Sequence, residues 1–219
     1  MNVVKGSYVD MLERLACSYG RNDEVPNIEL AEYLAETKNP SEIKEIVDGL
    51  TGKDKAVAND CIKVLYELGE RNPVLIQDYV DVFLHLLLSK NNRLAWGSMT
   101  ALALIAPYKA KEIFDSIAIV KKAYDLGSVI TVDQSMTVFA NLCKANKEYE
   151  KDLFPFLIQH LSSCRPKEVA QHAERIAICV NKNNYEDFIH TLQVRKPSLT
   201  LAQQKRLDKL IRSLAGLTK

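Results

Sequence analysis

The segment VANDCIKVLYELG, residues Val57–Gly69, recurs in altered form three more times along the chain. The matching segments are LAWGSMTALALIA (Leu94–Ala106), TVDQSMTVFANLC (Thr131–Cys143) and VAQHAERIAICVN (Val169–Asn181). Their first residues lie 37, 37 and 38 positions apart, and Ser-Met-Thr recurs in register in the second and third copies. A fixed period of this length predicts a chain built from repeated structural units.

Each copy carries small or apolar residues at offsets 0, 4, 7, 8 and 11 from its first residue. In the first copy these residues are Val57, Cys61, Val64, Leu65 and Leu68. With 3.6 residues per turn, these offsets fall on one face of an α-helix. A weaker fifth copy, Gln203–Ala215, keeps the pattern from Leu207 onward, as expected for a terminal repeat.

Other stretches with helical apolar periodicity precede the five copies. They are Ser41–Leu50, Val74–Ser89, Ile113–Leu126, Leu153–Ser162 and Tyr185–Gln193. Each is expected to pair with the copy after it as an antiparallel helical hairpin. Pro73 and Pro155 lie near the expected helix starts, where a missing N–H group costs little.

The first residues of the chain do not match the repeat. They predict two helices, about Val4–Tyr19 and Ile28–Glu36, joined by a polar loop. We expect residues 1–39 to form an N-terminal cap on repeats that span 40–215, all within a single domain of residues 1–219. A capping unit covers the open end of a stack of repeats.

A period near 37 and the form V-x-x-x-A-x-x-A-L-x-x-L-G resemble HEAT repeats, and Val57–Gly69 is the nearest match. The proline and Asp/Arg signals of HEAT repeats are patchy here, so an armadillo-like repeat stays open. The resemblance implies an all-α fold, a right-handed α–α superhelix (a HEAT/ARM-like solenoid) of about four to five helical hairpins. It also implies that the second helix of each hairpin lines a concave surface.

Net charge, cysteine content and the lack of long apolar segments limit the classes of protein to which the chain can belong. The formal net charge is +1, but residues 1–110 hold 12 Lys/Arg against 16 Asp/Glu, and residues 111–219 hold 17 against 12. The five cysteines are odd in number and form no CxxC motif, which predicts reduced thiols rather than a disulfide framework. The sequence shows no signal-peptide pattern and no apolar run of 18 residues, so we expect a cytoplasmic protein without a membrane partner.

Stacked hairpins bury their apolar faces against one another and leave an extended wall for recognition. On the second helices, residues at offsets 2, 3, 6 and 9 should face away from the core. We call one set of these residues the polar ladder: Asn59, Lys63, Thr100, Gln134, Thr137, Gln171 and Arg175.

The only tryptophan, Trp96, falls on the same surface beside the small residues Gly97, Thr100 and Ala103. An aromatic side chain among small residues predicts a pocket for a partner. The alternative is that Trp96 packs against the neighbouring repeat. The leading hypothesis is therefore a non-enzymatic scaffold that binds a protein or peptide around Trp96 and the polar ladder.

A basic set lies at the C-terminal end of this surface: Arg175, Lys205, Arg206, Lys209 and Arg212. These residues either hold phosphates or an acidic peptide, or form the solvated face of the last helix. The alternative function is nucleic-acid binding, since some DNA glycosylases resemble this chain in size and architecture. In that reading Tyr66, Trp96 and Asp133 would line the cleft, although a net charge of +1 argues against it.

Motifs for catalysis are missing from the sequence. The four histidines form no HxxxH or HExxH motif, and no Gly-rich phosphate loop or GxSxG elbow occurs. Cys164, with His160 four residues earlier, could act as a nucleophile if nearby cations lower its pKa, but a structural thiol is the better interpretation. We therefore expect no catalytic residues, no metal and no cofactor.

Overall fold

The computed structural model describes residues 10–218, and within that range the chain is helical and contains no strand. The α-helices are α1 (Val25–Thr37), α2 (Pro40–Gly49), α3 (Lys55–Arg71), α4 (Val80–Leu86), α5 (Asn92–Ile105), α6 (Ala110–Asp115), α7 (Ile117–Leu126), α8 (Val129–Ala145), α9 (Lys147–Ser163), α10 (Pro166–Ile176), α11 (Tyr185–Arg195) and α12 (Leu201–Leu214). The short 3-10 helices are η1 (Met11–Arg14), η2 (Ala16–Tyr19), η3 (Pro73–Leu75), η4 (Gln77–Tyr79), η5 (Ala177–Cys179), η6 (Lys196–Ser198) and η7 (Ala215–Thr218).

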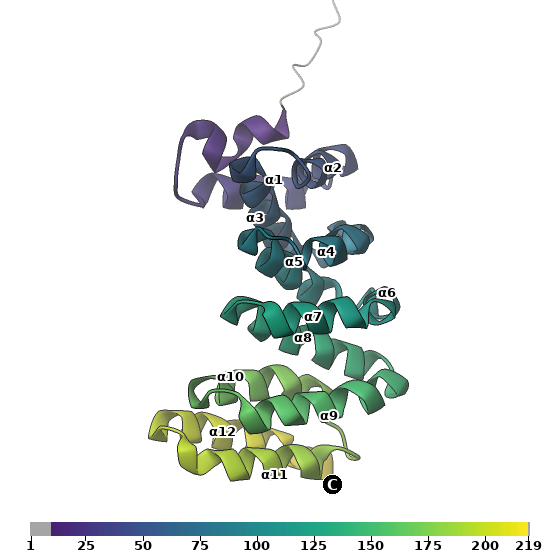
Figure 1. Ribbon diagram of the computed structural model, residues 1–219, viewed down its shortest axis with the longest axis vertical. Helices are drawn as coiled ribbons and strands as arrows, with labels where there is room; N and C mark the ends of the chain where they lie inside the picture. The colour runs from purple at the N-terminus through teal and green to yellow at the C-terminus, as the bar shows by residue number, and fades with distance from the viewer. Residues whose placement is uncertain (1–9, 219) are drawn as a thin grey trace, which may run out of the picture.

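The helices stack in sequence order from the purple N-terminal end to the yellow C-terminal end (Figure 1). The helices α1, α3, α5, α8, α10 and α12 form one continuous row, each packed against the next. We call them the row helices. All five copies of the sequence repeat begin in row helices, and the fourth leaves α10 at Ile176 to continue through η5. The expected solenoid is confirmed.

The core follows the repeat pattern. In the first four copies the residues at the five apolar offsets are buried, except Val57 and Ala177, which are half-buried. Side chains that accept a hydrogen bond from a backbone N–H begin many of the helices, as N-cap residues do. These N-caps are Asn39, Asp54, Asn91, Ser128, Asn146 and Thr200.

Several helices outside the row differ from the expected boundaries. The stretch Val74–Ser89 divides into η3, η4 and α4, and Ile113–Leu126 divides at Ser116 into α6 and α7. Ser116 has φ −108° and ψ 21°, which takes it out of regular helical geometry. Pro155 lies inside α9 rather than near its start, with its side chain exposed. Because proline has no N–H, the carbonyl of Lys151 lacks its helical hydrogen-bond donor. The position is exposed, so water can donate to this carbonyl instead.

The N-terminal region also differs from expectation. The predicted helix Val4–Tyr19 lies partly outside the described residues, and its described part forms η1 and η2, separated by the extended backbone of Leu15. The side chain of Asn27 is fully buried and accepts a hydrogen bond from the N–H of Ala16 at 3.0 Å. This bond holds η2 against α1, which itself packs along α3 as the first row helix.

No helix among residues 10–218 is both long enough and apolar enough to cross a membrane.

Candidate functional site

Polar side chains of the ladder cross from one row helix to the next. Between α8 and α10, Gln171 Nε2 donates to Asp133 Oδ2 at 2.9 Å. The Arg175 guanidinium donates to Thr137 Oγ1 at 2.5 Å and to Gln134 Oε1 at 3.2 Å. These half-buried contacts fix the distance and register between two neighbouring row helices.

The N-terminal half of the ladder is linked in the same way. Asn91, the N-cap of α5, donates through Nδ2 to Asn59 Oδ1 on α3 at 2.8 Å. Lys63 on α3 donates to Glu67 Oε1 at 2.6 Å and pairs with Glu24 Oε2, at the start of α1, at 3.0 Å. These ladder residues therefore serve as cross-links within the protein.

Two aromatic rings and two cations lie together on α3 and α5. The ring centroids of Tyr66 and Trp96 are 5.6 Å apart, with their planes tilted by 48°. Lys63 Nζ lies 4.9 Å from the Tyr66 ring centroid, and the Arg93 guanidinium carbon lies 5.8 Å from that of Trp96. Glu24 accepts a hydrogen bond from Arg93 as well. We call these five residues the aromatic cluster.

Charges in the aromatic cluster stabilise one another. Burial alone would lower the pKa of Lys63, but its hydrogen bonds to Glu67 and Glu24 outweigh burial and raise it. Burial likewise works to raise the pKa of Glu24, and the hydrogen bonds from Lys63 and Arg93 lower it instead. Burial raises the pKa of Tyr66, so its phenol stays neutral at physiological pH.

The small residues around Trp96 do not leave an open pocket. A Cβ atom added at Gly97 would lie 2.6 Å from Ile62 Cγ1, so Gly97 allows α5 to approach α3 closely. Thr100 is buried and donates through Oγ1 to the carbonyl of Trp96 at 3.0 Å, and Ala103 is buried as well. Trp96 itself is half-buried against the core, and part of its indole remains accessible.

The predicted orientation is wrong for several second-helix residues. Lys63, Tyr66 and Thr100 expose only 6%, 7% and 7% of their surface, and His172, at an offset expected to face outward, is fully buried. Each row helix between α1 and α12 has a row neighbour on both sides, so its buried arc is wider than a single apolar stripe.

The basic C-terminal set divides into paired and free cations. Arg206 on α12 forms a bidentate pair with Glu174 on α10, with both nitrogen–oxygen distances at 2.5 Å. Lys205, Lys209 and Arg212 are exposed and form no ion pair among the described residues.

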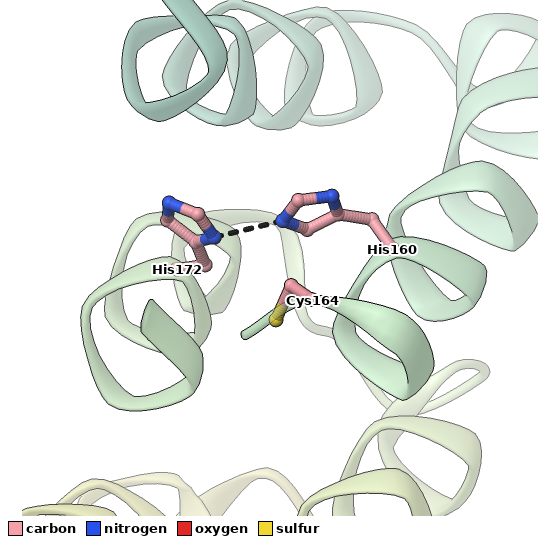
Figure 2. Close-up of side chains that lie close together, drawn as sticks. All are labelled: His160, Cys164 and His172. Atoms are coloured by element: carbon pink, nitrogen blue, oxygen red, sulfur yellow. Dashed lines mark hydrogen bonds between the residues drawn. The ribbon is translucent and has the colours of Figure 1, made fainter. Parts of the chain in front are cut away.

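A hydrogen-bond chain with a buried centre and partly buried ends runs from Tyr124 on α7 to Asp133 on α8. Tyr124 Oη lies 2.8 Å from His160 Nδ1, His160 Nε2 lies 2.7 Å from His172 Nδ1, and His172 Nε2 lies 2.6 Å from Asp133 Oδ1. Figure 2 shows the two imidazole rings facing each other across the space between their helices. Burial, with a smaller contribution from His172, lowers the pKa of His160 to about 4, so the ring is neutral at physiological pH.

Cys164, the C-cap of α9, lies beside this histidine pair. The ligand atoms of His160, Cys164 and His172 all lie within 4.8 Å of one another. Burial raises the pKa of the Cys164 thiol and outweighs the opposite effect of Arg195, so the lowered pKa that a nucleophilic role would require is not found. The sequence patterns missed the cluster because its two histidines are 12 residues apart, on different helices joined by a tight turn at Pro166.

The five cysteines are all free thiols, which agrees with the prediction that they form no disulfide framework. Cys61, Cys143 and Cys179 are buried in the core, as the helical pattern predicts.

An apolar patch lies apart from the ladder, near the turn between α7 and α8. Leu126, Val129 and Ile130 expose 74%, 50% and 44% of their surface. Leu88, which lies between α4 and α5, and Leu126 line a common pocket of about 380 Å³.

Comparison with known proteins defines the fold and leaves the partner open. No protein-family model matches the chain, and no curated protein matches it in sequence. An engineered protein of known structure is similar over 94% of this chain and 96% of its own, with 20% identity and a TM-score of 0.62. A designed armadillo repeat protein in complex with the peptide (KR)4 is similar over 87% of this chain and 86% of its own, with 15% identity and a TM-score of 0.64.

A further similar structure belongs to computationally designed armadillo repeat proteins for modular peptide recognition. It covers 92% of this chain and 97% of its own, at 14% identity and a TM-score of 0.59. These similarities, together with the row of stacked helices, show that the chain is an all-helical solenoid of the armadillo-repeat type.

Proposed function

We propose that this protein is a non-enzymatic scaffold that binds a peptide or an extended protein segment along the exposed edge of its row helices. The half-buried Trp96 is the observation on which the proposal depends. Its indole is held in place by Tyr66 and Arg93 and is still partly accessible. A rigid aromatic side chain next to charged groups is typical of the residues that dominate binding energy at protein interfaces.

The cross-linked ladder supports the same proposal. Because Arg175 already donates hydrogen bonds to Gln134 and Thr137, these residues hold the surface in one geometry before a partner arrives. A preorganised surface loses less conformational entropy on binding. The armadillo-type neighbours add support, since one of them is in complex with a peptide and another was designed for peptide recognition.

The experiment selects peptides from a random display library against the full chain and measures their affinity by titration calorimetry. Trp96→Ala should weaken binding of the selected peptides by about 30-fold, as expected for a hot-spot residue. Tyr108→Ala is the matched control, because Tyr108 is an aromatic side chain that is 52% exposed outside the row helices. Equal affinity of the wild type and the Trp96→Ala variant would refute this placement of the site.

Nucleic-acid binding is the second candidate, and the free cations of α12 are the observation in its favour. Lys205, Lys209 and Arg212 could contact phosphates, whereas Arg206 is already held by Glu174. A gel-shift series with duplex and single-stranded DNA tests it, because phosphate contacts make affinity fall steeply with salt. Absence of a shift at low salt, or a shift that survives conversion of all three cations to glutamine, removes this candidate.

A further inference from the structure

We propose that His160, Cys164 and His172 form a zinc-binding site between α9 and α10. The two histidines come from facing helices and Cys164 ends the first of them (Figure 2). Two imidazole nitrogens and one thiolate are ligands that Zn²⁺ favours. Three protein ligands leave the fourth tetrahedral position to a water molecule or an added ligand.

The ring nitrogens that would not bind the metal already have partners. His172 Nε2 lies 2.6 Å from Asp133 Oδ1, and His160 Nδ1 lies 2.8 Å from Tyr124 Oη. Metal-binding histidines generally donate their second N–H to a carboxylate or another oxygen, which orients the ring. Both rings are therefore oriented with their remaining nitrogens, His160 Nε2 and His172 Nδ1, toward each other at 2.7 Å.

Protonation states without a metal follow from the partners. Asp133, as a carboxylate, can only accept, so His172 Nε2 carries a proton, and in the singly protonated ring Nδ1 presents a lone pair. His160 Nε2–H then donates to that lone pair across 2.7 Å, and Tyr124 donates to His160 Nδ1. In this state only His160 has to change tautomer to bind a cation, because His172 Nδ1 already presents a lone pair.

Binding of Zn²⁺ requires modest and balanced changes. The proton on His160 moves from Nε2 to Nδ1, and the Tyr124 hydroxyl rotates to accept from Nδ1. The Cys164 thiol loses its proton to solvent, so each bound Zn²⁺ releases one proton. Tetrahedral bond lengths imply nitrogen–nitrogen separations of about 3.3 Å and nitrogen–sulfur separations of about 3.6 Å. The two histidine nitrogens, now 2.7 Å apart, must therefore move slightly apart. The Cys164 sulfur, which lies within 4.8 Å of both nitrogens, must move closer to them.

Burial makes the site selective for a small ion. His160 is 6% exposed and His172 is fully buried, so an organic substrate cannot reach the rings. Cys164, at the end of α9, is only half-buried and is the most accessible of the three residues. A site closed in this way would fasten α9 to α10 rather than present a catalytic surface.

The experiment titrates Co²⁺ into the full-length chain, prepared without an affinity tag and with reduced thiols. We expect saturation at one Co²⁺ per chain, with the visible absorption of tetrahedral Co²⁺ and a sulfur-to-cobalt charge-transfer band. Zn²⁺ should displace the cobalt. Cys164→Ser should remove the charge-transfer band, and His172→Gln should weaken binding at least tenfold. Asp133→Asn should weaken binding by about 10–100-fold, as changes to the partners of metal-binding histidines do.

Matched controls are Cys17→Ser, a second half-buried cysteine, and His190→Gln, an exposed histidine on α11. Both should bind Co²⁺ as the wild type does. A measurement on the wild type alone covers the case in which a variant fails to fold: Zn²⁺ should slow alkylation of Cys164 and leave alkylation of Cys17 unchanged. A wild-type chain without a tetrahedral cobalt spectrum, a spectrum unchanged by Cys164→Ser, or equal alkylation of Cys164 with and without Zn²⁺ would overturn the proposal.

Discussion

His172 Nε2 donates to Asp133 Oδ1 at 2.6 Å, and this partly buried contact joins α10 to α8. Gln171 donates to the other oxygen of the same carboxylate at 2.9 Å. The Asp133 carboxylate thus accepts hydrogen bonds from two successive residues, Gln171 and His172, of the neighbouring row helix.

Removing this acceptor should destabilise the stack. Asp133→Leu leaves the buried N–H of His172 without a partner, so we expect the free energy of unfolding to fall by about 1–3 kcal/mol. Asp133→Asn keeps an acceptor oxygen and should cost less. Urea unfolding of both variants measures the difference. Asp152→Leu, at an exposed position on α9, is the control and should change the value by less than about 0.5 kcal/mol. Equal losses for Leu and Asn at position 133 would contradict the role given to the hydrogen bond.

Acid should weaken the metal-free protein through His160. Burial lowers the pKa of His160 from 6.5 to about 4 in the folded chain, so the unfolded chain binds this proton more readily. The contribution of the neutral ring is complete above pH 6.5 and is lost as the pH falls toward 4. The loss should reach about 2–3 kcal/mol. Urea unfolding across this pH range measures the loss.

The His160→Gln variant isolates this effect. It should show a flatter pH dependence of unfolding than the wild type between pH 6.5 and 4, because glutamine does not titrate. His190→Gln removes an exposed histidine and should keep the wild-type slope. A wild-type slope in His160→Gln would show that other groups cause the acid response.

Gly97→Ala should destabilise the contact between α3 and α5. The new Cβ would lie 2.6 Å from Ile62 Cγ1, and overpacking of a well-filled core costs about 1–3 kcal/mol. Gly216→Ala is the control, because nothing lies within 4 Å of its Cβ position. A double-mutant cycle with Ile62→Ala completes the measurement. If Gly97→Ala costs as much when Ile62 is already alanine, the predicted clash is not the cause.

The last helix depends on its N-cap. Thr200 Oγ1 accepts from the N–H of Gln203 at 3.4 Å, and Gln203 Oε1 accepts from the N–H of Thr200 at 3.0 Å. Thr200→Ala should therefore cost about 1 kcal/mol. Hydrogen exchange should show faster opening confined to α12. Thr37→Ala, at the exposed end of α1, should leave exchange in α12 unchanged, and faster exchange throughout the chain would contradict a local effect.

Sequence periodicity was sufficient to predict the row helices α3, α5, α8, α10 and α12, because their apolar offsets are repeated at a nearly constant spacing, whereas α1 does not carry the repeat. It did not predict the breaks in the outer helices, since Ser116 interrupts a stretch that is apolar and periodic on both sides. Pro155 led to the opposite error. The sequence placed it near the start of a helix, but it lies inside α9, where a proline near the surface can be accommodated.

The surface was harder to predict than the core. Lys63 and Tyr66 follow the phase of an outward face, yet contacts with α1 and α5 bury them. The pairing of His160 with His172 depends on how two helices meet at a turn. Helical periodicity shows which residues of one helix share a face, but it carries no information about how two helices pack at a turn.

The row arrangement also determines how the chain can change in length. Each row helix between α1 and α12 packs against the one before it and the one after it, so the chain is built from layers in contact with their neighbours. Deleting or duplicating one unit of about 37 residues would alter the stack by one layer. The contacts at the new junction would differ, because those of Asp133 with Gln171 and His172 belong to one pair of layers. Under the proposed function, the length of the segment that the stack can hold would change with the number of layers.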